Sequence, residues 1–113
     1  MDTELVVRAQ HGDEGAFTSL AVAVGDRLHA VAHRILRDTD LAEDATQQAL
    51  LDVWRDLPQL RDPARFDAWS YRLLVRACYA EARRTENRRR SRWVGVLPNP
   101  VAHMSRAHSK RRL

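Results

Sequence analysis

The residues with the clearest chemical potential are arginines gathered toward the C-terminal end. Six of them fall within residues 83–92, and on a continuous helix Arg84 and Arg88 would share one face, while Arg76, Arg83 and Arg90 would lie near another. Guanidinium groups arranged in this way can follow a phosphate backbone while neighbouring aromatic rings stack on unpaired bases. Such a run is also typical of a solvated end or a localisation signal, so composition leaves both interpretations open.

Two aromatic rings, Trp69 and Tyr71, precede the arginines. Residues two apart on a helix do not face each other, so we expect them to point in different directions. We expect Trp69 on the buried side and Tyr71 as the candidate exposed ring. The alternative is that both rings are packed and that Tyr71 only covers the surface.

A second polar set lies along one predicted helix face and consists of carboxylates and amides: Asp40, Glu43, Asp44, Gln47, Gln48 and Asp52. A strip of this kind can meet a basic protein surface, where charge complementarity sets the register and the association rate. The alternative is again structural. Acidic residues are favoured in the first turn of a helix by its dipole, and charged strips are often simply solvated.

No catalytic constellation is apparent in the sequence. His29 and His33 are four residues apart, with Asp26 three before them, a spacing that is necessary for a helical metal site but not sufficient. There is no phosphate-cradling glycine-rich loop, and the single cysteine, Cys78, lies beside an apolar stripe. We therefore expect no enzyme, no metal, no cofactor and no small-molecule substrate.

The elements that must position these residues are helices, because apolar residues recur with helical spacing and no segment alternates with the period of a strand. We predict an all-α bundle of about four helices over residues 3–10, 13–37 and 40–57 and from residue 62 into the arginines, followed by a disordered tail. Asp40 with Glu43 has the layout of a capping box, and Asp62-Pro63 suits a helix start.

Each long helix carries an apolar stripe that we expect to be buried. The second helix contributes Phe17, Leu20, Ala21, Val24, Leu28, Val31 and Ile35. The third contributes Leu41, Ala45, Ala49, Leu50, Val53, Trp54 and Leu57. The fourth contributes Phe66, Trp69, Leu73, Ala77 and Ala80.

Composition and charge agree with one small globular domain. The chain has 113 residues, of which 44% are hydrophobic and 30% charged. Residues 1–82 hold nine arginines against fourteen acidic residues, a net charge of −5, whereas residues 83–113 hold ten basic residues against Glu86 alone, a net charge of +9. We predict a helical domain over 1–92 and a flexible linker or tail over 93–113, where Gly95, Pro98 and Pro100 interrupt any pattern.

Cysteine usage and hydropathy indicate the compartment. Cys78 has no partner for a disulfide, which suits a reducing environment. No apolar run approaches the roughly 20 residues that a bilayer crossing requires. The acidic N-terminal residues Asp2 and Glu4 do not resemble the basic start of a signal peptide. We expect a soluble, cytoplasmic protein without membrane contact.

Three motifs in order resemble bacterial sigma factors of the extracytoplasmic-function (ECF) group. Residues 12–17 (GDEGAF) look like the start of their region 2 domain, residues 40–55 (DLAEDATQQALLDVWR) resemble its core-binding helix, and residues 66–76 (FDAWSYRLLVR) with Arg83-Arg84 are similar to its promoter-reading helix. The likeness covers about residues 4–92. The ordered set is far more specific than any one motif.

The resemblance implies a DNA-binding transcription initiation factor. It implies that the acidic and amide face (Asp40, Glu43, Asp44, Gln47, Gln48, Asp52) binds the clamp helices of the largest subunit of core RNA polymerase. It also implies recognition and melting of the minus-ten promoter element, with a flipped base held by the loop and last helix: Leu60, Arg61, Asp62, Pro63, Trp69, Tyr71, Arg72, Arg76, Arg83 and Arg84. An anti-sigma factor is a further candidate partner.

The sequence also departs from the family pattern. The family often has Gln-Glu where Gln47-Gln48 stands, Asn in place of Arg76 and Asp in place of Ala80. Only 21 residues follow Arg92, too few for the region 4 domain that reads the minus-thirty-five element. Two alternatives therefore stay open. One is an interaction module that acts as a decoy for polymerase or an anti-sigma factor without promoter activity, and the other is a nonspecific basic nucleic-acid binder.

Overall fold

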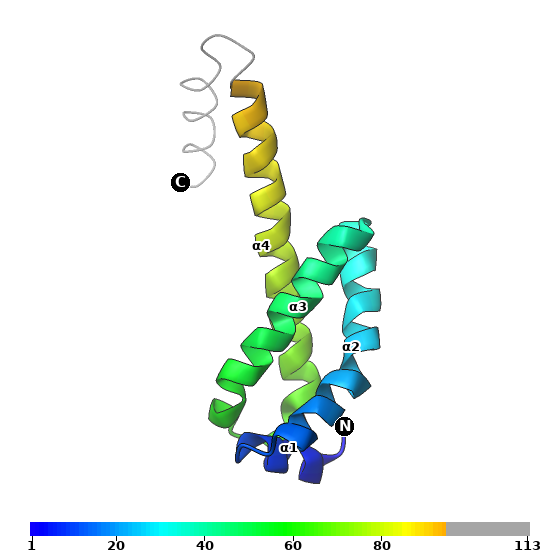
Figure 1. Cartoon of the computed structure of the whole chain (residues 1–113), viewed down its shortest axis with the longest axis vertical. Coiled ribbons are helices and arrows are strands. Elements are labelled where there is room, and N and C mark those ends of the chain that lie inside the picture. Colours follow the sequence, from blue (N-terminus) through cyan, green and yellow to red (C-terminus); the bar gives the residue numbers. More distant parts are fainter. Residues whose placement is uncertain (95–113) are drawn as a thin grey trace. The chain divides into compact units, whose positions relative to one another are not determined.

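The computed structural model describes residues 1–94 of the chain and confirms the all-α prediction (Figure 1). Its elements, in chain order, are α1 (Thr3–Gln10), α2 (Glu14–Leu36), α3 (Thr39–Asp56), the 3-10 turns η1 (Leu57–Gln59) and η2 (Pro63–Arg65), and α4 (Phe66–Val94). The first helix has the predicted bounds, and the other three lie within a few residues of theirs. Short connections make α2 and α3 an antiparallel pair (Figure 1).

Capping residues set the starts of the first two helices. Asp2 accepts a hydrogen bond from the Glu4 amide at 3.0 Å, and Asp13 accepts one from the Ala16 amide at 3.0 Å. Each carboxylate satisfies a backbone N–H that has no partner within its helix. Gly12 between the two helices has a φ of 94°, a left-handed conformation that residues with a Cβ adopt only with strain.

The start of α3 differs from the prediction. Its N-cap is Asp38, which accepts from the Leu41 amide at 3.0 Å, and Asp40 lies within the first helical turn. The predicted capping box of Asp40 and Glu43 is therefore wrong. Arg37 closes α2 in the left-handed conformation with φ of 53°, so the chain reverses within two residues and leaves Asp38 as the first extended residue before α3.

The core lies between α2, α3 and the first part of α4, with α1 packed against α2. Leu20, Val24 and Leu28 on α2 and Phe66 and Leu74 on α4 are at most 1% exposed. The inward side of α3 is lined by small residues, and Ala42, Ala45 and Ala49 are fully buried. Small side chains let the backbones of two helices approach closely, so these alanines allow α3 to pack tightly against its neighbours.

Two residues of the predicted stripes are exposed, and six are only half-buried. Ile35 is 39% exposed in the last turn of α2, where the chain turns away toward α3. Trp54 is 47% exposed near the end of α3, and Ala80 is only half-buried. On α4 the prediction also left out residues that are buried. Ser70, Cys78 and Glu81 are all buried on α4.

The loop between α3 and α4 is fixed by α1. Gln10 at the end of α1 donates through Nε2 to the carbonyl oxygens of Leu57 at 3.2 Å and Leu60 at 2.8 Å. Asp62 then caps η2 by accepting from the Ala64 amide at 3.0 Å, and Pro63 occupies the first position of that turn. Asp62-Pro63 therefore begins the helical path into α4, as predicted, through a 3-10 turn.

The chain divides into two compact units at Ala82 and Arg83, within the continuous helix α4. This is also the point at which the charge changes from net acidic to net basic. The predicted boundary between residues 92 and 93 stays a prediction. The predicted tail lies outside the described residues from Gly95 onward. Among the residues that the structure describes, no helix is both long and apolar enough to cross a membrane.

Candidate nucleic-acid and protein-binding surfaces

The outward side of α4 in the first unit combines aromatic rings with arginines. Tyr71 is 46% exposed, and Arg72 and Arg76, four residues apart on one face of the helix, are exposed as well. The exposed ring of Tyr71 is as the sequence predicted. Tyr79, one of the most exposed large side chains at 61%, lies seven residues after Arg72 and so shares its face. Sequence reasoning missed Tyr79, although its spacing from Arg72 and Arg76 was the available signal.

Trp69 lies apart from this surface. Its ring is partly buried against the core, with its centroid 6.0 Å from that of Phe66. As predicted, Trp69 and Tyr71 point in different directions. The structure therefore places Trp69 in core packing and does not bring it beside the exposed ring of Tyr71.

The two edges of the outward face contact different elements. On one edge, Asp67, one turn before Tyr71, forms an ion pair with Arg27 of α2 at 3.2 Å. On the other, Arg76 acts on Asp56 at the end of α3. The pKa of Asp56 is lowered mainly by the hydrogen bond from Arg55 and further by the positive charge of Arg76. Tyr71 therefore leans toward α2 and Arg76 toward the loop that follows α3.

The predicted loop residues have unequal access to a partner. Leu60 packs against the core, and its carbonyl oxygen accepts a hydrogen bond from Gln10. Its side chain therefore helps to hold the loop in place. Pro63 is half-buried, whereas Arg61 and Asp62 are exposed. Asp62 is already engaged in capping η2, which leaves Arg61 as the exposed cation of the loop.

The second unit contributes the arginine-rich part of α4. Arg83, Arg84, Arg88, Arg89 and Arg92 are all exposed. Arg88 donates to the Thr85 hydroxyl at 3.2 Å, one turn earlier on the helix. The predicted helical continuation into the arginines is confirmed, and on it Arg84 and Arg88 share a face.

The outward side of α3 holds the carboxylates and amides. Asp40, Glu43, Asp44, Gln47 and Gln48 are exposed. Asp52 is half-buried, accepts from Gln48 Nε2 at 3.0 Å and pairs with Arg55 at 3.3 Å. The first five side chains are thus presented to solvent together, whereas Asp52 is already engaged within its own helix.

The same side of α3 continues into an apolar part that the sequence analysis did not anticipate. Leu51 is 61% exposed, and Trp54 lines a groove of about 560 Å³ between α2 and α3. The wall on α2 is formed by Glu14, Phe17, Thr18 and Ala21. Phe17 and Trp54 meet edge to face with ring centroids 4.7 Å apart, which holds the Trp54 ring at the end of the groove.

The remaining candidate groups do not form a site. The rings of His29 and His33 are 6.5 Å apart, and among the described residues no group of three or more His, Cys, Asp or Glu is close enough to hold a metal ion. Cys78 is buried in the core, and burial raises the pKa of its thiol, which disfavours the reactive thiolate.

Comparison with known proteins identifies the fold. Residues 20–89, which include most of α2, all of α3 and the loop, and most of α4, match the family described as Sigma-70 region 2. The chain belongs to this family. Region 2 is not a class of enzymes, in agreement with the sequence prediction.

Relatives of this region 2 domain are sigma factors. The chain is 33% identical over 85 residues to the ECF RNA polymerase sigma factor SigM of Mycobacterium tuberculosis, covering 75% of this chain and 43% of that protein. It is 32% identical over 74 residues to the ECF RNA polymerase sigma-E factor of Escherichia coli K12, covering 66% of this chain and 38% of that protein. The resemblance to ECF sigma factors is thereby confirmed over region 2, and the chain spans about two fifths of these relatives.

A solved structure shares the region 2 fold. The NMR structure of an engineered region 2 of sigmaE in complex with GTAAAA superposes with a TM-score of 0.71 at 29% sequence identity. The superposition covers 78% of this chain and 92% of that chain. The described helices therefore correspond to nearly the whole of that domain.

Proposed function

We propose that this region 2 domain binds core RNA polymerase through α3 and recognises and melts the minus-ten promoter element through α4 and the loop before it. The observation that carries the proposal is the outward side of α4. Tyr71, Arg72 and Arg76 are exposed there, on a fold shared with a region 2 solved in complex with GTAAAA.

The chemistry of α4 suits an unpaired strand more than a duplex. Stacking of a base on an aromatic ring contributes about 1–3 kcal/mol, and each phosphate contact adds an electrostatic contribution that weakens with salt. Extruding a base from a duplex costs a few kcal/mol, which a ring and neighbouring arginines together can offset. In this proposal Arg61 of the loop and Arg83 and Arg84 of the second unit supply further phosphate contacts.

The outward side of α3 suits a basic protein partner. Its exposed carboxylates and amides complement lysine and arginine side chains, which supports docking on the clamp helices of the largest polymerase subunit. Exposed Leu51 and Trp54 beside the groove add an apolar contact, and tryptophan is among the residues that most often carry binding energy at protein interfaces.

The proposed DNA activity is tested with labelled single-stranded oligonucleotides by fluorescence anisotropy. A panel that contains GTAAAA and base-substituted versions of it should show a base preference, and affinity should fall with salt. Arg72→Gln should weaken binding to every sequence and reduce the salt slope by about 0.7, the value for one phosphate contact on a single strand. Equal affinity for all sequences would refute promoter recognition and favour a nonspecific binder.

The proposed polymerase contact is tested by titrating the protein with core polymerase. Asp44→Arg should abolish most of the binding, because it places a positive charge in the middle of the exposed acidic face. Asp26→Arg makes the same change at an exposed position of α2 and serves as the matched control. If both variants bind like the wild type, the docking face is not on α3.

A further inference from the structure

The edge of α2 that faces α4 carries two arginines seven residues apart, Arg27 and Arg34. Seven residues are close to two turns, so both side chains lie on the same side of α2. Arg27 forms an ion pair with Asp67 of α4 at 3.2 Å, which establishes that this side faces α4. Neither arginine belongs to the residues that the sequence or the family resemblance marked for DNA binding.

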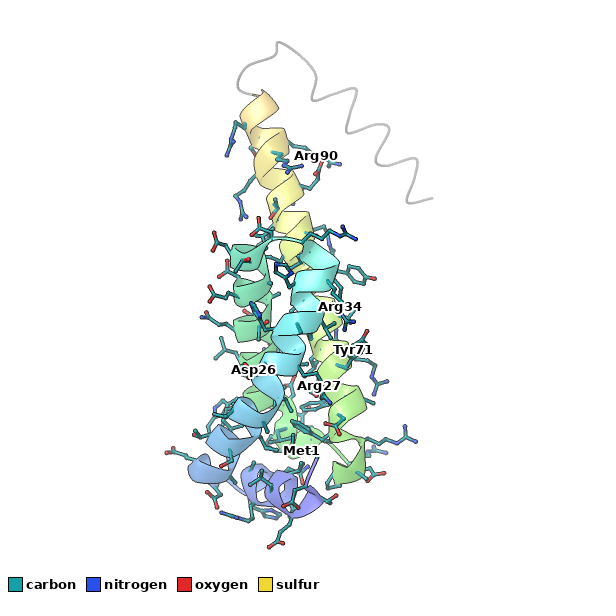
Figure 2. All side chains as sticks on the ribbon, turned by 90° about the vertical axis from the view of Figure 1, so that its right-hand side faces the viewer. Met1, Asp26, Arg27, Arg34, Tyr71 and Arg90 are labelled. Carbon is teal, nitrogen blue, oxygen red and sulfur yellow. The ribbon has the colours of Figure 1, made fainter. Side chains whose placement is uncertain are left out.

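Tyr71 lies beside the same edge. Within the first unit, α2 and the first part of α4 run in the same direction, since both start at the end of the bundle where α1 lies (Figure 1). Tyr71 is one turn after Asp67, so it lies one turn further along than the contact with Arg27. Figure 2 shows Arg27, Tyr71 and Arg34 following one another along one face of the molecule.

The two arginines differ in their partners. Arg27 is paired with Asp67, and Asp67 also forms an ion pair with the Met1 amino group at 3.0 Å. Arg34 is exposed, and among the described residues it has neither a hydrogen bond nor an ion pair. Tyr71, 46% exposed, thus lies on the same face of the molecule as one unpaired guanidinium on α2 and is followed in sequence by another, Arg72, on α4 (Figure 2).

We infer that Arg34 and Tyr71 form a seam between α2 and α4 that holds an unpaired DNA strand, with a base stacked on the Tyr71 ring and the adjacent phosphate bound by Arg34. This inference rests on the proposed function and extends the DNA-binding surface onto α2. Tyr71 alone would bind any aromatic or apolar group. The cations on both sides select a stacked group that carries negative charge, as a nucleotide does.

The test compares Arg34→Gln with the wild type on the same single-stranded oligonucleotides over a range of salt concentrations. Loss of one phosphate contact should reduce the salt slope by about 0.7, which corresponds to about fivefold weaker binding at 0.1 M monovalent salt. The reduction should be equal for every sequence, because a phosphate contact carries no base information. Arg34→Lys keeps the charge and should retain the slope.

Arg8→Gln is the matched control, because it removes the same charge from an exposed arginine of α1 that is engaged with Asp13. A double-mutant cycle of Arg34→Gln with Tyr71→Leu should be non-additive if both hold one nucleotide segment. If Arg34→Gln matches Arg8→Gln while the wild type keeps its base preference, the seam is refuted and the proposed function stands. If the wild type shows no base preference, the proposed promoter recognition is refuted, whatever the result for Arg34→Gln.

Discussion

The helices α3 and α4 contribute to the same core but present opposite chemistry to solvent. Outward on α3 lie carboxylates and amides, followed by the apolar pair Leu51 and Trp54. Outward on α4, in the first unit, lie tyrosines and arginines. Inward, α3 is built from alanines, whereas α4 inserts the large side chains of Phe66 and Leu74.

The difference teaches that one small core can support two separate binding surfaces. Packing determines the inward positions of each helix, because interiors are dense and tolerate little change in volume. The outward positions are under no such restriction, so one helix can be selected for a basic protein partner and the other for a polyanion. Substitutions on one surface are therefore expected to leave the other intact, and only changes in the shared core should affect both.

The largest effect is expected from the shared core. Phe66→Ala removes a fully buried ring at the start of α4 and should lower the free energy of unfolding by about 3–5 kcal/mol. Urea denaturation followed by circular dichroism measures this loss. Binding to DNA and to polymerase should weaken together at temperatures where the variant is partly unfolded. If one activity survived in the unfolded fraction, the two surfaces would not share a scaffold.

The next effect is expected on the DNA side alone. Tyr71→Ala removes a half-exposed ring and should weaken binding to single-stranded minus-ten oligonucleotides by about 1–3 kcal/mol, or roughly 5- to 150-fold. Affinity for core polymerase should not change, because that partner is proposed to contact α3. Ala68→Ser, also exposed on the first turns of α4, is a control with little expected effect on either activity. Loss of polymerase binding in Tyr71→Ala would contradict the separation of the surfaces.

A smaller effect is expected at the start of the acidic helix. Asp38→Ala removes the carboxylate that caps α3 and should lower the free energy of unfolding by about 1 kcal/mol. Asp40→Ala, two residues later, removes only a favourable interaction with the helix dipole and should have a smaller effect. Thermal melting of the two variants side by side distinguishes them. An equal or larger loss of stability in Asp40→Ala would indicate that Asp40 caps α3, as the sequence pattern predicted.

The capping error shows what the sequence can and cannot predict here. Periodicity and capping chemistry predicted the helices to within a few residues, because these depend on local interactions. Choosing between Asp38 and Asp40 required knowing that Arg37 adopts a left-handed conformation and ends α2. Asp38 and Asp40 are only two residues apart, so the preference of aspartate for N-cap positions does not distinguish them.

The predictions of which residues are buried failed where burial depends on distant elements. Trp54 fits the helical stripe of α3, yet it is 47% exposed, because it lies at the groove between α2 and α3, where its ring meets Phe17. The stripe of α4 contains Ser70 and Glu81, whose polarity hides their buried positions from a hydrophobic pattern. Tyr71 was predicted correctly as exposed because Trp69 occupies the other side. The contribution of Arg34 becomes apparent only when α2 and α4 lie beside each other (Figure 2).

The smallest effect concerns the link between α2 and α4 and depends on pH. The pKa of Asp67 is lowered mainly by the hydrogen bond from the Met1 amino group and further by Arg27. A carboxyl group whose pKa is lower in the folded state stabilises the fold above its unfolded pKa, near 3.9, and loses that contribution as the pH falls through the folded pKa.

The carboxylate of Asp67 is 43% exposed, so solvent screening limits its contribution to less than about 1 kcal/mol. Asp67→Asn should therefore be slightly less stable than the wild type near about pH 6, and the difference should disappear toward about pH 2. Urea denaturation of both proteins across this range measures the difference, with Asp26→Asn on α2 as a control. A difference that persisted in acid would show that Asp67 stabilises the start of α4 by packing and not by charge, and the α2 edge beside Tyr71 would then be held without this ion pair.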